Sequence, residues 1–125
     1  MGFPRIQTIL NNAINNWRND PNNGQPPNLD KHNTPGRPPF GWATKAQLLN
    51  TTAFGLPLIQ TNMIGATPKM GAQTNLVMVF RTGVKLGATT VRMPDGAPPA
   101  PAPNPYISDA DIQAIEDWID AGCPD

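Results

Sequence analysis

The sequence predicts an all-α fold for the whole chain, residues 1–125, taken as a single domain. Apolar residues recur with helical spacing near both ends of the chain. Between these segments, many of the 16 prolines and 11 glycines divide the chain into short pieces, so we expect long ordered loops to join the helices. A chain of this length is large enough to bury one hydrophobic core.

The first helix is predicted from an apolar stripe that begins just after Pro4. Proline suits a first helical turn, where its missing N–H has no partner to lose. Asparagines occupy the opposite, polar face, and they are only moderate helix formers, so we expect this helix to depend on packing against the rest of the domain. The stripe consists of Ile6, Ile9, Leu10, Ala13, Ile14 and Trp17.

A second helix is expected to start at Thr44. A threonine cap with Gln47 three positions later has the spacing of a capping box. We expect this helix to end near Phe54, because Gly55 and Pro57 are strong stop signals.

A third, short helix is predicted from about Thr74 to Thr82, with Gly83 as its terminator. The rival prediction is a strand, because "LVMVF" is a continuous apolar run to which periodicity assigns no structure. The following "VKLGATTVRM" is expected to be extended or looped. The run "APPAPAPNP" is expected to form a stiff polyproline II connector.

The last helix has the clearest local signals in the chain. Ser108 is a favourable N-cap, and Asp109 and Asp111 place negative charge in the first turn, where the helix dipole favours it. Gly122 is suited to end the helix. The stripe predicted to be buried is Ile112, Ile115, Trp118 and Ile119.

The composition excludes several classes of function. Nine basic and nine acidic side chains cancel and form no run of like charge, which argues against nucleic acid as a partner. A single cysteine and a single histidine, Cys123 and His32, leave too few ligands for a cysteine or multi-histidine metal site. We find no set of nucleophile and base, no membrane span and no signal peptide, so we expect a protein that is not an enzyme.

The run "RMPDG…ISDADIQAIEDWIDAGCPD" resembles the C-terminal third of bacterial c-type cytochrome domains. In that family an Arg-Met-Pro loop supplies the methionine that binds haem iron, and Met93 holds the matching position. The opening "FPRIQTILNNA" is similar to the family's first helix, and "TNLVMVFRTG" to a middle helix. The resemblance implies crossed N- and C-terminal helices with two shorter helices, and a periplasmic or extracellular ancestry.

The chain departs from the family at the haem-attachment motif. Where the family has Cys-x-x-Cys-His, this sequence has Ile14, Trp17 and Arg18 at the positions of the two cysteines and the histidine. Thioether bonds to haem require thiols, and the protonated guanidinium of Arg18 has no lone pair for iron. We therefore expect no cofactor.

Loss of haem would leave an apolar void, and a cavity costs about 24 cal/mol per Å³ of residual volume. We expect bulky residues at the vacated positions and the flexible methionines to fill it. These residues are Ile14, Trp17, Met63, Met70, Met78 and Met93.

The sequence thus favours a haem-free binding or assembly module with a protein partner. Phe40 and Trp42, beside two prolines, are candidates for an exposed contact patch. One alternative is an electron-transfer protein whose noncovalent haem is held by His32 and Met93, since His–Met ligation is a known haem arrangement. Another is a pocket that binds a different small apolar ligand.

Overall fold

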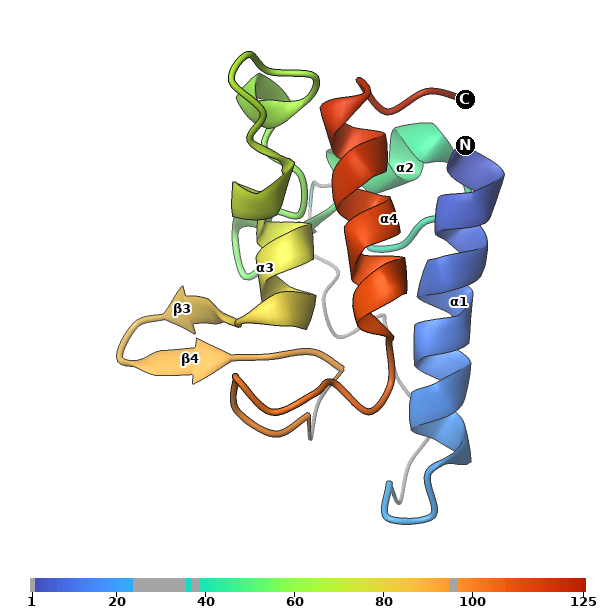
Figure 1. Ribbon diagram of the computed structural model, residues 1–125, viewed down its shortest axis with the longest axis vertical. Helices are drawn as coiled ribbons and strands as arrows, with labels where there is room; N and C mark the ends of the chain where they lie inside the picture. Colours follow the sequence, from blue (N-terminus) through green and yellow to red (C-terminus); the bar gives the residue numbers. More distant parts are fainter. Residues whose placement is uncertain (1, 24–35, 37–38, 95–96) are drawn as a thin grey trace.

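The structure is a computed structural model that describes residues 2–23, 36, 39–94 and 97–125. Figure 1 shows the course of the chain. In chain order the elements are α1 (Phe3–Asn19), α2 (Lys45–Asn50), β1 (Thr52–Ala53), β2 (Leu56–Pro57), the 3-10 helices η2 (Thr61–Met63) and η3 (Gly71–Gln73), α3 (Asn75–Arg81), β3 (Val84–Leu86), β4 (Thr89–Val91) and α4 (Asp109–Asp120).

The N- and C-terminal helices pack against each other. Helices α1 and α4 lie side by side and run in opposite directions (Figure 1). The rings of Phe3, at the start of α1, and Trp118, near the end of α4, have centroids 6.2 Å apart. An ion pair of 3.2 Å joins Arg5 to Asp111 on the outside of the same contact.

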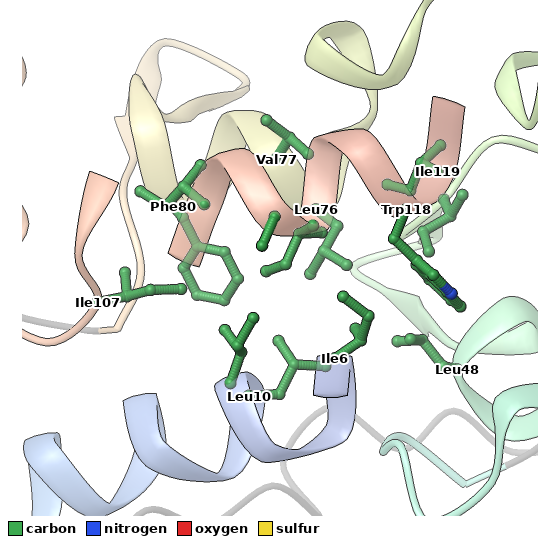
Figure 2. Packing of buried hydrophobic residues seen from close by; sticks show 14 of the residues in the cluster. Ile6, Leu10, Leu48, Leu76, Val77, Phe80, Ile107, Trp118 and Ile119 are labelled. Atoms are coloured by element: carbon green, nitrogen blue, oxygen red, sulfur yellow. The ribbon is translucent and has the colours of Figure 1, made fainter. Parts of the chain in front are cut away.

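The hydrophobic core lies where the four α-helices meet. Figure 2 shows side chains of α1, α2, α3 and α4, together with Ile107, pointing toward one another. The apolar stripe predicted for α4 is entirely buried. The stripe predicted for α1 is buried at its first four positions, Ile6, Ile9, Leu10 and Ala13.

The predicted all-α fold class is wrong, because the described residues also form two small antiparallel sheets, so the structure mixes helices and strands. Strands β1 and β2 pair in one sheet, and β3 and β4 pair in the other. The segment "VKLGATTVRM", expected to be extended or looped, contributes the second hairpin, with Leu86 opposite Thr89. Figure 1 shows this hairpin projecting from the end of α3.

Helix α2 ends four residues earlier than predicted, at Asn50. The hydroxyl of buried Thr51 donates toward the carbonyl oxygens of Gln47 and Gly41, at 2.8 and 2.9 Å, and accepts from the N–H of Gly41. This fixes the helix end against the preceding loop, and the chain then turns into β1. Gly55, which was predicted to end the helix, lies instead in the turn between β1 and β2.

Local sequence signals set the remaining helix ends. The predicted caps at Thr44 and Ser108 are confirmed, and the structure adds a third cap at Thr74. The side chain of each accepts a hydrogen bond from the backbone N–H three residues later. Gly83 follows α3 with a φ of 99°, and Gly122 follows α4 with a φ of 94°. The prediction of a helix for "LVMVF" is also confirmed, since α3 covers this run.

The segment before α3 approaches α4 closely at Gly71. Its N–H donates to the Asp120 carboxylate at 2.8 Å. A Cβ atom at this position would lie 2.6 Å from Asp120 Oδ1 and 2.8 Å from the carbonyl oxygen of Glu116. The contact between η3 and α4 therefore requires glycine.

We predict that Gly71→Ala lowers the free energy of unfolding by about 1–3 kcal/mol, because the added methyl group forces η3 away from α4. Chemical denaturation followed by circular dichroism measures the change. Gln73→Ala, in the same 3-10 helix and exposed, is the control and should change the value by less than about 0.5 kcal/mol. Equal effects of the two substitutions would contradict the close approach.

Candidate functional site

The loop that carries Met93 is held by backbone hydrogen bonds. The N–H of Met93 donates to the carbonyl oxygen of Val79 at 2.9 Å, and the carbonyl of Met93 accepts from Asn104 Nδ2 at 2.8 Å. Its side chain is half-buried. The main chain of Met93 is thus fixed on both sides by other parts of the protein.

The side chain of Arg92 connects this loop to the end of α3 and to the proline-rich segment. Its Nε donates to the carbonyl oxygen of Phe80 at 3.1 Å. Its Nη1 donates to the carbonyls of Pro98, at 2.9 Å, and Ala102. A guanidinium offers five N–H groups in a fixed plane, and here they bind main-chain oxygens of two separate segments.

Asn104 forms a second link at the same place. Its side chain is buried, and its Nδ2 donates to the carbonyls of both Phe80, at 3.1 Å, and Met93. Its Oδ1 accepts from the N–H of Tyr106 at 3.0 Å. Asn104 was not among the residues predicted from the sequence. The available signal was its position before a proline, in a run where an Asn side chain can form a turn with the N–H two residues on.

The three positions that the family resemblance aligns with the haem-attachment motif lie on the last turns of α1. Ile14 and Trp17 are half-buried and Arg18 is exposed, and none of them belongs to the buried core. The carbonyl oxygen of Trp17 accepts from Asn23 Nδ2 at 2.7 Å. Ile14 and Trp17, which were expected to help fill a void left by haem, thus contribute no side chain to the buried core.

Tyr106 joins this end of α1 to the Met93 loop. The carbonyl of Tyr106 accepts from Asn16 Nδ2 at 3.0 Å, and its hydroxyl donates to Asp20 Oδ2 at 2.9 Å. The N–H of Asn22 and the Tyr106 hydroxyl both donate to the Asp20 carboxylate and lower its pKa. Residues 104–106 therefore contact Met93 at one end and α1 at the other.

A polar groove of about 320 Å³ runs between α1 and the segment that leads into α4. Amide, hydroxyl and carboxylate groups form much of its wall. It is lined by Ile9, Asn12, Ala13, Asn16, Asn104, Pro105, Tyr106, Ile107, Ser108 and Asp111. Met93 does not line this groove, and neither do Ile14, Trp17 and Arg18.

Phe40 and Trp42, the predicted contact patch, form an edge-to-face pair with ring centroids 5.9 Å apart. Trp42 is half-buried, packs against the core and donates from Nε1 to Asn11 Oδ1 at 2.8 Å. Gln7 Nε2 also donates to the Trp42 carbonyl at 3.1 Å. Trp42 thus attaches the preceding loop to α1, and Phe40 is the outer, half-buried ring of the pair.

The four methionines expected to fill a void are all half-buried and lie outside the buried core. The core consists instead mainly of Ile, Leu, Val and aromatic side chains. Cys123 is part of it, and burial raises the pKa of its thiol to about 11, so the thiol is protonated at neutral pH. His32 lies outside the described residues.

Carboxylates gather at the end of α4, where Glu116, Asp117 and Asp120 bring oxygen atoms within 4.8 Å of one another. Glu116 pairs with Arg81, and Asp120 accepts the N–H of Gly71. Glu116 and Asp120 therefore join α4 to α3 and η3.

Comparison with protein-family models, with curated proteins and with solved structures returns no match. Within the described residues, no helix has the length and apolar character needed to cross a membrane.

We predict that Asn104→Ala lowers the free energy of unfolding by about 2–3 kcal/mol, because the carbonyl of Met93 and the N–H of Tyr106 lose a side-chain partner and the carbonyl of Phe80 keeps only the bond from Arg92. Thermal and chemical denaturation measure the effect. Asn12→Ala, on the opposite wall of the groove and exposed, is the matched control and should change stability little. A similarly small effect at both positions would refute the role given to Asn104.

We predict that Tyr106→Phe raises the pKa of Asp20 toward the ordinary carboxyl value, because the variant lacks the hydroxyl donor. The pKa of Asp20 should stay partly lowered, because the N–H of Asn22 still donates to this carboxylate. A lowered pKa stabilises the fold above the unfolded-state pKa, and this contribution is lost as pH falls through the folded-state pKa. An NMR titration of the carboxyl carbon gives the midpoint; an unchanged midpoint would count against the contact.

Proposed function

We propose that this protein is a haem-free relative of c-type cytochrome domains and serves as a protein-binding or assembly module, not as an electron carrier. The resemblance of "RMPDG…ISDADIQAIEDWIDAG" and of the first helix supports the relationship. The residues at Ile14, Trp17 and Arg18 support the loss of haem, since they provide no thiol and no neutral imidazole.

The observation that carries the proposal is the way in which the Met93 loop is held. In a cytochrome of this class, the bond from methionine sulfur to iron helps to fix the loop. Here Val79 and Asn104 bind the main chain of Met93, and Arg92 binds the end of α3. Because the chain itself supplies these bonds, the loop needs no iron to keep its position.

A protein partner suits the surface composition of the chain. Charged residues make up 14% of the sequence, below the usual quarter, and the formal net charge is zero. Protein interfaces are depleted in charged residues at their centre, whereas nucleic acids and anionic membranes select positive patches. This composition therefore favours contact with another protein.

Titration with hemin tests the haem-free state. We expect no sharpened Soret band and no stoichiometric end point, and the same spectra for wild type and Met93→Leu. The matched change Met78→Leu, at another half-buried methionine, controls for general effects on packing. Uptake of one hemin per chain with a band that Met93→Leu alone abolishes would refute the proposal. That result would favour ligation by His32 and Met93.

A further inference from the structure

Helix α1 contains more asparagine than an exposed helix face favours. Five of its 17 residues are asparagines, and all five are exposed. Asparagine is a poorer helix former than alanine, lysine or glutamate, which suit an exposed helix position better. A residue that weakens its own helix is expected to make a compensating contact. The five residues are Asn11, Asn12, Asn15, Asn16 and Asn19.

Two of these asparagines have such a contact within the protein. Asn11 Oδ1 accepts from Trp42 Nε1 at 2.8 Å, and Asn16 Nδ2 donates to the carbonyl of Tyr106 at 3.0 Å. Within the described part of the chain, the side chains of the other three form no hydrogen bond. Of these three, Asn12 alone lines the groove between α1 and the segment that leads into α4. Its amide is therefore available at the groove both as an acceptor and as a donor.

The start of α4 adds a hydroxyl and a carboxylate to the same groove. Ser108 Oγ accepts the N–H of Asp111 at 3.1 Å, which leaves its hydroxyl hydrogen to donate elsewhere. One carboxylate oxygen of Asp111 pairs with Arg5 at 3.2 Å, and the other oxygen remains an acceptor. Asn16 Oδ1 is a further acceptor, since only its Nδ2 is used by Tyr106. The groove thus offers donors and acceptors together, and Arg5 balances its one charge.

A neutral sugar fits this set of groups. Each hydroxyl of a sugar is one donor and two acceptors, so two neighbouring hydroxyls bind both the oxygen and the nitrogen of an amide such as that of Asn12. A phosphate or carboxylate ligand would meet the carboxylate of Asp111 and no cation in the lining. The volume of about 320 Å³ lies near the lower end of the range for small-molecule sites, about 300–1,000 Å³, which favours one sugar unit over a longer chain.

We infer that the groove between α1 and residues 104–108 binds one unit of a neutral sugar. Asn12 and Asn16 bind its hydroxyls from α1, and Ser108 and Asp111 bind them from the start of α4. The C–H groups of the sugar ring lie over the buried apolar part of the lining, which includes Ile9, Ala13 and Ile107.

NMR titration of the full chain with D-glucose, D-galactose, D-mannose and N-acetyl-D-glucosamine tests this inference. Sugar concentrations up to about 50 mM detect the millimolar dissociation constants that so small a ligand allows. We expect at least one of these sugars to shift the side-chain amide signals of Asn12 and Asn16 and the backbone signal of Ser108 until they saturate. Saturable shifts with none of the four sugars, or shifts spread evenly over the protein, would overturn the inference.

Asn12→Ala should weaken binding of that sugar by about fivefold or more, because the hydrogen bonds of the amide are lost. Alanine is the better helix former, so the variant should fold at least as well as wild type, and an undiminished melting temperature confirms this. Asn15→Ala is the matched control, because Asn15 is exposed on the same helix but does not line the groove. It should leave the dissociation constant unchanged. Equal effects of the two substitutions would contradict the assignment of the groove.

A peptide main chain also offers neutral donors and acceptors, so a blocked glycine peptide, N-acetyl-triglycine amide, is the second probe. We expect no saturable shift of the groove signals with this peptide. If the peptide binds there as tightly as the sugars or more tightly, the sugar assignment is wrong and the groove is a contact for a protein partner.

Sugar binding is independent of the proposed role as a protein-binding module, and the two fail separately. Stoichiometric hemin uptake would refute the proposed function and leave the sugar titration unaffected. A chain that takes up neither hemin nor any of the four sugars would overturn sugar binding alone.

Discussion

The positions of the loops of residues 92–94 and 97–105 depend on hydrogen bonds to the carbonyl oxygen of Phe80. It lies at the end of α3, where the last carbonyls of a helix have no partner within the helix. Both Arg92 Nε and Asn104 Nδ2 donate to it, at 3.1 Å each. The ring of Phe80 is buried in the core, so these two bonds fasten the loops of residues 92–94 and 97–105 to the best-packed part of the protein.

From this point, hydrogen bonds lead to the far end of α1. Asn104 binds the carbonyl of Met93 and the N–H of Tyr106, and Tyr106 then contacts Asn16 and Asp20. The segment 104–106 thus spans from the Met93 loop to the turns where the family resemblance places the haem-attachment residues. Polar contacts of the chain itself set the relative position of these two regions.

The sequence predicted those features that short-range chemistry decides. The caps at Thr44 and Ser108 and the apolar stripe of α4 follow from residues within one or two turns. The first hairpin could not be predicted in this way, because its strands are two residues long and Phe-Gly is not a typical turn pair. The half-burial of Ile14 and Trp17 depends on where α4 begins. The helical period of α1 shows which residues share a face, but it carries no information on the position of α4.

The links made by Arg92 and Asn104 were also beyond sequence reasoning, since a side chain that binds distant main-chain carbonyls leaves no periodic pattern. The same holds for Trp42, whose partner Asn11 lies on what the sequence presents as the polar face of α1. The resemblance directed attention to Met93, but what the structure adds is the set of contacts that hold its main chain.

Hydrogen exchange at the amide of Met93, measured by NMR on the protein without added hemin, tests most directly whether the chain itself orders this loop. This N–H donates to Val79, so we expect exchange slowed by about a thousandfold or more relative to an unstructured peptide, with no change on adding hemin. Exchange at the unstructured rate, with protection appearing only after hemin is added, would show that a ligand and not the chain orders this loop.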